Sequence, residues 1–190
     1  MSKRIAFLSA AALSALALTA ALVAPVSAQD KTMAGEKTVM VGGAAMFLSK
    51  NIIQNAVNSK DHTTLVAAVK AAGLVETLEG KGPFTVFAPT NAAFGKLPAG
   101  TVDTLVKPEN KATLSKILTY HVVAGKLEAS SLTDGKKLKT VEGEELTVKK
   151  SGDKVTIVDA KGGSSTVTIS NVNQSNGVIH VVDTVLMPAS

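Results

Sequence analysis

The sequence predicts an α+β domain, with short helices in its first half and mainly antiparallel strands in its second. Between residues 50 and 118, apolar residues recur at steps of three and four, which is the period of a helix. Between residues 146 and 170 they alternate with threonine, serine and lysine, which is the period of a half-exposed strand. No internal repeat is visible, and the spacing leaves room for one domain, over residues 42–188.

Six helical segments are expected, one of them directly after Pro89. Residues 50–58 carry isoleucine, alanine and valine at helical spacing. A second helix begins near Asp61, a good N-cap residue, and stops at Gly73. Residues 74–80 add one more turn, and further helices are expected at residues 101–106 and after Pro108, which suits a first helical turn.

Two runs predict buried strands. Residues 84–88 are aromatic and β-branched and lie between Gly82-Pro83 and Pro89. Residues 178–182 are apolar on both faces apart from His180, which indicates a central strand covered on two sides. Turn signals separate the later strands, at Asp134-Gly135, Glu142-Gly143, Ser151-Gly152-Asp153 and Gly162-Gly163.

The N-terminus indicates export. Lys3 and Arg4 precede an apolar run from Ile5 to Ala24, and small residues follow at the positions that a signal peptidase reads. We expect a signal peptide over residues 1–28, cleavage after Ala28 and a flexible leader over residues 29–41. The alternative is an uncleaved membrane anchor, because about 20 apolar residues can cross a bilayer. The mature chain is expected to be periplasmic or extracellular, with no membrane span.

Composition excludes several classes of function. The chain has no cysteine, so disulfides, thiol nucleophiles and cysteine-bound zinc are absent. The formal net charge is +5, and lysines gather between residues 136 and 150. Glutamates are interspersed there and aromatic residues are missing, so a solvated surface is expected rather than a nucleic-acid site.

Three motifs in order resemble those of the fasciclin domain family. They are Thr85-Val86-Phe87-Ala88-Pro89-Thr90-Asn91-Ala92-Ala93-Phe94, the pair Tyr120-His121, and the run from Asn176 to Pro188. The resemblance implies antiparallel β-sheets in a wedge or sandwich, with a layer of short helices. It also implies an extracellular adhesion module with binding determinants at Tyr120 and His121, in some members for integrin-type receptors.

The residues themselves favour structural roles for the two end motifs. Pro89 ends a strand, and Thr90 or Asn91 can cap a following helix that buries Phe94. Near the C-terminus, Gly177 follows Asn176 as a turn signal before the last strand, which carries His180 and leads to Asp183.

The Tyr120-His121 pair has two interpretations. It forms a binding determinant, as the resemblance implies, or Tyr120 is an aromatic residue at the edge of the core whose hydroxyl reaches a partner within the domain.

Catalysis is not expected. The histidines are His62, His121 and His180, and no Gly-x-Ser-x-Gly elbow or His-x-x-x-His metal pair accompanies them. Residues three apart on a strand point to opposite faces, so His180 and Asp183 should not pair. No metal and no cofactor is expected.

Two non-catalytic functions remain. The first is an exported interaction module whose partners are envelope or host surface proteins or glycans. The second is a carrier of an apolar, carotenoid-like molecule, for which four apolar residues could supply an adaptable lid: Met33, Met40, Met46 and Phe47. These four residues can equally belong to the core or to the leader.

Overall fold

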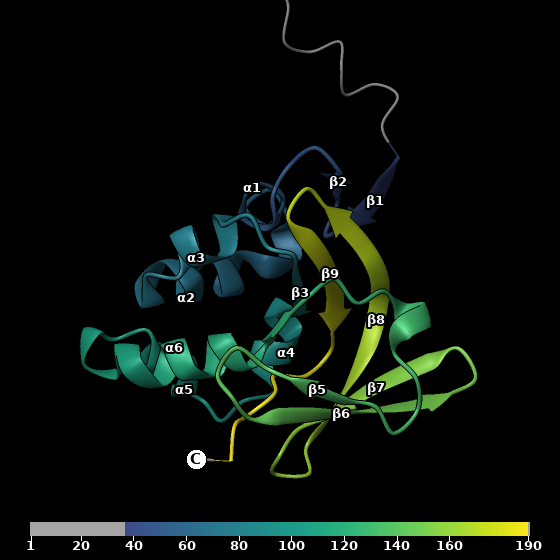
Figure 1. Cartoon of the computed structure of the whole chain (residues 1–190). Coiled ribbons are helices and arrows are strands. Elements are labelled where there is room, and N and C mark those ends of the chain that lie inside the picture. Colours follow the sequence, from purple (N-terminus) through teal and green to yellow (C-terminus); the bar gives the residue numbers. More distant parts are fainter. Residues whose placement is uncertain (1–36, 190) are drawn as a thin grey trace, which may run out of the picture.

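The computed structural model of the chain describes residues 37–189 (Figure 1). The strands are β1 Thr38–Val41, β2 Ala44–Phe47, β3 Phe84–Pro89, β4 Val122–Ala124, β5 Lys137–Lys139, β6 Glu145–Ser151, β7 Lys154–Val158, β8 Ser164–Gln174 and β9 Gly177–Val182. The α-helices are α1 Ile52–Ala56, α2 Thr63–Ala72, α3 Val75–Glu79, α4 Asn91–Gly95, α5 Thr101–Leu105 and α6 Lys111–Tyr120. Three short 3-10 turns lie at Lys60–His62, Pro108–Asn110 and Ala129–Ser131.

Seven strands form the main sheet, in the order β4-β3-β9-β8-β7-β6-β5. Its neighbouring strands are antiparallel except β3 and β9, which run parallel from Phe84 beside Gly177 to Pro89 beside Val182. The α+β class is confirmed, with helices mainly from the first half of the chain. The parallel pair was not anticipated, because it joins segments about 90 residues apart.

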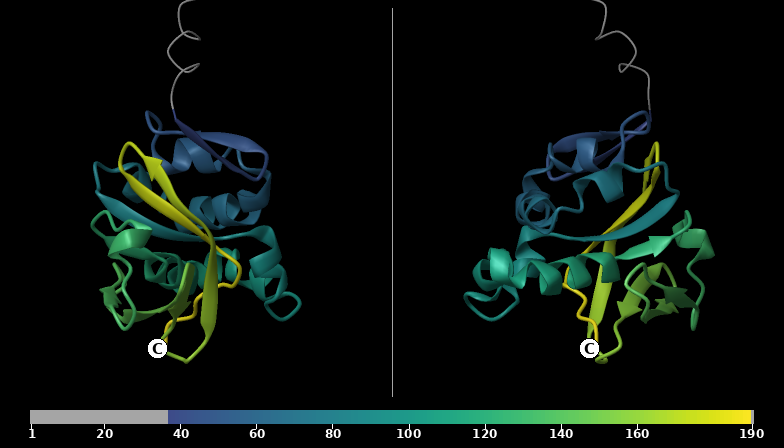
Figure 2. Two further views of the ribbon diagram at one scale, coloured as in Figure 1. Left: turned by 90° about the vertical axis from the view of Figure 1, so that its right-hand side faces the viewer. Right: turned by 60° about the vertical axis from the view of Figure 1, so that its left-hand side comes forward.

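The sheet curls until its two ends meet. Thr140, just after β5, forms a bridge with Val123 of β4, and the Val141 N–H donates to the Val122 carbonyl at 2.7 Å. Strand β8 bends through irregular register between Val167 and Val172, which directs its two ends toward different parts of the molecule. The result is a small, partly closed barrel with the helices packed outside it (Figure 2).

Two hydrophobic cores follow from this arrangement. Val86 and Ala88 of β3 face the helices, whereas Phe87 points the opposite way and packs inside the barrel. Strand β9 divides in the same manner, with Val181 toward the helices and Val182 inside the barrel. All six residues of β9 are buried, which confirms a central strand covered on both faces.

The start of α2 differs from the prediction. Residues Lys60–His62 form a 3-10 turn, so α2 begins at Thr63 and Asp61 does not cap it. Its cap comes from another element, because Asn91 Oδ1 accepts a hydrogen bond from the Thr64 N–H at 3.0 Å. The predicted stop at Gly73 is confirmed, since Gly73 has a left-handed φ of 73°.

The ordered part begins earlier than expected. Residues 38–41, assigned above to the flexible leader, form β1, and Val41 is buried in the core on the helix side. Pairing with β2 and burial of Val41 give these residues a fixed place. The predicted signal peptide, its cleavage after Ala28 and residues 29–36 lie outside the described residues. Within residues 37–189, no helix has both the length and the apolar character that crossing a bilayer requires.

Candidate functional site

Tyr120 and His121 lie inside the protein, not on its surface. Their side chains are 0% and 1% exposed, so neither can touch a partner of the folded domain directly. The Tyr120 hydroxyl accepts a hydrogen bond from the Ala160 N–H at 2.9 Å, and burial raises the pKa of that hydroxyl. The geometry matches the second interpretation, an aromatic residue whose hydroxyl is bonded within the domain, and any part that the pair plays in binding stays a prediction.

His121 connects α6 to the C-terminal segment. Its Nδ1 lies 2.8 Å from the Ile117 carbonyl, which can only accept, so Nδ1 carries the proton. Its Nε2 then accepts from the Leu186 N–H at 3.0 Å. Burial lowers the pKa of His121 to about 4, and the imidazole is therefore neutral at physiological pH.

His180 and Asp183 bind different partners. The Nε2 of His180 donates to the Leu127 carbonyl at 2.7 Å, and the ring stacks on Phe87. Asp183 accepts from the Thr166 N–H at 2.9 Å. Burial alone would raise the pKa of Asp183, but the hydrogen bonds and nearby Lys96 hold that pKa below its usual range.

The other motif residues hold elements together. Thr90 Oγ1 accepts from the Ala93 N–H at 3.2 Å and caps α4, in which Phe94 is buried. Asn176 Oδ1 accepts from the Ile52 N–H at 3.1 Å, and its Nδ2 donates to the Leu78 carbonyl at 2.7 Å. The motifs thus stabilise the fold through connections between distant segments.

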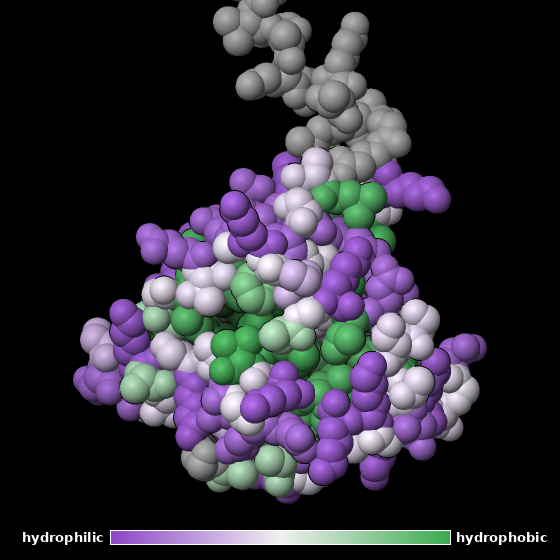
Figure 3. All heavy atoms as spheres, viewed as in Figure 1, coloured by the Kyte–Doolittle hydropathy of each residue, from purple (hydrophilic) through white to green (hydrophobic). Residues whose placement is uncertain are grey.

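An apolar groove lies on the surface between α3 and α6. Its floor is made of Leu78, Leu118 and Val122, all buried. Leu74, Phe84 and Val141 form its apolar sides, and Val141 is 44% exposed. Thr77 and Thr119 complete the lining. Figure 3 shows apolar side chains gathered in this region and charged ones around it. We call this feature the α3–α6 groove.

The Tyr120-His121 pair positions part of this groove. Leu118 and Thr119 directly precede the pair and Val122 directly follows it, and all three line the groove. The buried pair fixes the backbone here, so its neighbours are held on the groove wall. Sequence reasoning missed the groove. One feature of the sequence could have indicated it. Val141 is apolar but lies in the polar turn before Gly143, where an exposed apolar residue is unusual.

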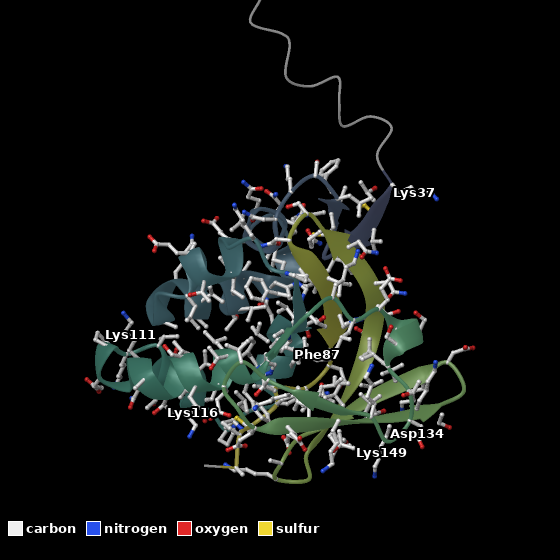
Figure 4. All side chains as sticks on the ribbon, viewed as in Figure 1. Lys37, Phe87, Lys111, Lys116, Asp134 and Lys149 are labelled. Atoms are coloured by element: carbon white, nitrogen blue, oxygen red, sulfur yellow. The ribbon has the colours of Figure 1, made fainter. Side chains whose placement is uncertain are left out.

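The two helices beside the groove carry charges of both signs. Lys111 and Lys116 project from α6 (Figure 4), and Glu76 and Glu79 lie on α3. The Lys116 Nζ also lies 3.6 Å from a carboxylate oxygen of Glu142, the residue that follows Val141. The groove is small, with a cavity volume of about 30 Å³, so it suits one side chain of a partner rather than a drug-sized ligand.

Over residues 37–189, no three acidic or histidine side chains come together in a way that could hold a metal ion. The three histidines are each buried and have lowered pKa values. With an apolar lining and no convergent titratable groups, the groove defines a binding module rather than a reaction centre.

Comparisons with known proteins show which family of binding modules this chain belongs to. The fasciclin domain model matches residues 60–188, and the chain belongs to the fasciclin domain family. This family consists of non-enzymatic adhesion and interaction modules, so the expectation that the chain is not an enzyme is confirmed.

A solved structure supports the fold. It contains a pair of these domains from the insect cell adhesion molecule Fasciclin I and matches with a TM-score of 0.65 and 17% identity, over 73% of this chain and 51% of that one.

Bacterial relatives are closer in sequence. Protein sll1483 of Synechocystis sp. is 48% identical over 88% of this chain and 90% of its own length. The immunogenic protein MPB70 of Mycobacterium bovis is 40% identical over 69% of this chain and 65% of its own length. The cell surface glycolipoprotein MPB83 of the same species is 40% identical over 77% of this chain and 64% of its own length.

Proposed function

We propose that the protein is an exported adhesion module that binds its partner through the α3–α6 groove. The observation that carries the proposal is a small apolar groove between α3 and α6 whose lining includes Val141, a large apolar residue that is 44% exposed. Exposed apolar surface rimmed by polar residues is typical of protein interaction sites. An extracellular or periplasmic location is supported by the signal-like N-terminus and by relatives named as immunogenic or cell surface proteins.

The partner is an envelope or host surface protein, or a glycan chain attached to one. An apolar anchor in the groove, with glutamates on α3 and lysines on α6, matches a protein segment better than a uniformly charged polymer.

Photo-crosslinking tests this surface. A photoreactive phenylalanine placed at Val141 should form a covalent adduct with an envelope component on intact cells, identified by mass spectrometry. The matched control is the same residue at Val57, a valine that is 48% exposed and outside the groove. Wild-type protein without the photoreactive residue, added in excess before illumination, should reduce the yield of the adduct, whereas Val141→Asp added in the same way should not. Equal adducts from both positions, or none from Val141, would exclude the groove as the binding surface.

The carrier function is the second candidate. The observation in its favour is an apolar internal cavity that includes Met46. That cavity has a volume of about 40 Å³, whereas pockets for drug-sized ligands measure roughly 300–1,000 Å³. A carotenoid-like molecule would need a large opening of the domain, so the structure favours the interaction module. Visible absorption of protein purified from its native host would support the carrier instead.

A further inference from the structure

The β1–β2 hairpin turns one of its faces outward. Val41 is buried in the core on the helix side, so strand alternation places Thr38 and Met40 on the opposite face. The pairing of the two strands sets Met40 opposite Ala45 and Thr38 opposite Phe47. Met40 is 60% exposed and Phe47 is half-buried, so two large apolar side chains lie on this outer face. We call these four residues, Thr38, Met40, Ala45 and Phe47, the hairpin face.

The charges beside the hairpin face are positive. The Nζ of Lys50 lies 5.0 Å from the centroid of the Phe47 ring, and Lys37 projects away from the domain at the same end of the hairpin (Figure 4). Residues 37–60 contain three lysines and no aspartate or glutamate. Asp61, the next residue, lies beside the turn between β1 and β2, at the other end of the hairpin. The face is therefore apolar at its centre and cationic at the end where the strands begin and finish.

The hairpin also lies close in the chain to the predicted export segment. β1 and β2 form one end of the molecule, and the C-terminus lies toward the other end (Figure 1, Figure 2). The apolar run from Ile5 to Ala24 is joined to Lys37 by residues 25–36, and a chain of that length spans about 40 Å at most. While the run is in a bilayer, the hairpin face is thus held within reach of the lipid surface.

We propose that the hairpin face docks the exported domain on the surface of a bilayer that contains anionic phospholipid. Met40 and Phe47 enter the boundary between headgroups and acyl chains, and Lys37 and Lys50 lie at the lipid phosphates. Apolar side chains flanked by lysines are typical of segments that lie in this boundary, because a lysine buries its stem and keeps its ammonium group in water. Each lysine near an anionic surface adds about 1 kcal/mol of attraction.

The size of the face favours lipid over a protein partner. Two large apolar side chains make a small patch, whereas a stable protein interface buries about 800 Å² on each partner. A bilayer surface needs no matching shape, so a few inserted side chains and paired charges are enough for reversible binding.

A hollow beside the hairpin gives a lipid headgroup room. It has a cavity volume of about 370 Å³, and its lining includes Lys37, Leu48 and Asn173. These three residues offer a positive charge, an apolar side chain and an amide, which match the phosphate, the first carbons and the hydroxyl groups of a phospholipid headgroup. Lipid docking goes beyond the proposed function, because the α3–α6 groove lies on other elements and stays free for its own partner.

A fluorescent label reports which face meets the lipid. The chain has no cysteine, so Met40→Cys accepts a single environment-sensitive label on the exported protein. Vesicles of equal parts phosphatidylglycerol and phosphatidylcholine should shift the emission of this label to the blue. The matched control is Val141→Cys, at an apolar position that is 44% exposed and lies outside the hairpin, and its emission should not change. Equal shifts at the two positions, or no shift at position 40, would overturn the proposal.

Cosedimentation of unlabelled protein with the same vesicles separates the apolar and the charged contributions. Lys50→Gln should weaken binding about fivefold, and Met40→Gln about tenfold. The control Lys149→Gln removes an exposed lysine of β6 and should change binding less than twofold. Equal losses for Lys50→Gln and Lys149→Gln would show attraction by net charge alone and overturn the docking face.

Sedimentation velocity without vesicles distinguishes lipid from a second copy of the chain. A wild-type dimer that Met40→Gln dissociates would assign the hairpin face to self-association and overturn the proposal, whereas a monomer in both cases supports it. Met40 and the Lys50 ammonium lie outside the core, so these variants should keep the wild-type circular dichroism spectrum.

Discussion

Asn91 shows how one side chain can join two helices that the sequence separates. Its Oδ1 accepts from the Thr64 N–H at 3.0 Å, and its Nδ2 donates to the Lys60 carbonyl at 2.8 Å. Asn91 therefore provides a hydrogen-bond acceptor for a free backbone N–H at the start of α2, although Asn91 itself lies at the start of α4. The adjacent Thr90 caps α4 itself.

Asn91→Ala should lower the free energy of unfolding by about 2 kcal/mol, because it removes a helix cap and a second hydrogen bond together. Urea denaturation monitored by circular dichroism measures the change. Asn58→Ala is the control, since Asn58 is exposed and its amide makes a bond only to the Gln54 carbonyl within its own segment. Its cost should stay below about 0.5 kcal/mol. Equal losses in the two variants would contradict the bridging role.

The sequence predicts such residues only in part. Capping of α4 by Thr90 follows from local spacing and is found. The partner of Asn91 is not local, because Thr64 lies 27 residues earlier, and periodicity contains no information about that distance. The same reasoning explains why Asp61 is a plausible cap in the sequence and not the cap in the structure.

At the level of elements, the backbones of β3 and β9 lie close together where β9 begins. A Cβ atom added to Gly177 would lie far inside contact distance of the Phe84 carbonyl oxygen. Glycine is required there by backbone proximity, which lets β9 pair in parallel with β3 and reach both cores.

Gly177→Ala should lower the free energy of unfolding by about 3 kcal/mol or more, because backbone atoms cannot move aside as a flexible side chain can. Thermal unfolding and soluble yield measure the effect. Gly95→Ala is the matched control, since Gly95 ends α4 with open space around its Cα. It should be neutral or stabilising by up to about 1 kcal/mol. Comparable tolerance of both substitutions would refute the close approach.

Element types were predictable where one face is apolar and the other polar. The alternation in β6, β7 and β8 and the double-sided burial of β9 follow directly from the order of residues. Closure of the sheet between Val123 and Thr140 was not predictable, because it depends on backbone pairing and bending in β8.

At the level of the whole molecule, the groove and the cavity exist because two cores share one sheet. The helices cover β3 and β9 from one side, and the incomplete contact between α3 and α6 leaves Leu78, Leu118 and Val122 between a surface depression and an internal space. Three different segments supply those residues. The sequence motifs identified the segment around Tyr120 and His121. They did not show that the adjacent residues Leu118, Thr119 and Val122 line the groove.

The buried histidines also give the whole domain a defined response to acid. All three have lowered pKa values, chiefly because burial disfavours the charged form. Below pH 6.5 the three histidines become protonated in the unfolded chain, whereas in the folded domain they stay neutral to a lower pH. Their contribution to stability is therefore complete above pH 6.5 and is lost as the pH falls, down to about pH 4 for His121.

We expect the free energy of unfolding to fall by about 2 kcal/mol between pH 6.5 and pH 5 from His121 alone, with further loss from His62 and His180. Urea denaturation at pH 7.5, 6.5, 5.5 and 5.0 measures this slope. His121→Gln offers an oxygen to the Leu186 N–H and does not titrate, so it should be less stable at pH 7.5 yet lose less stability on acidification. An unchanged slope in that variant, or a wild-type protein equally stable at pH 7.5 and 5.0, would show that His121 takes up its proton without disturbing the fold.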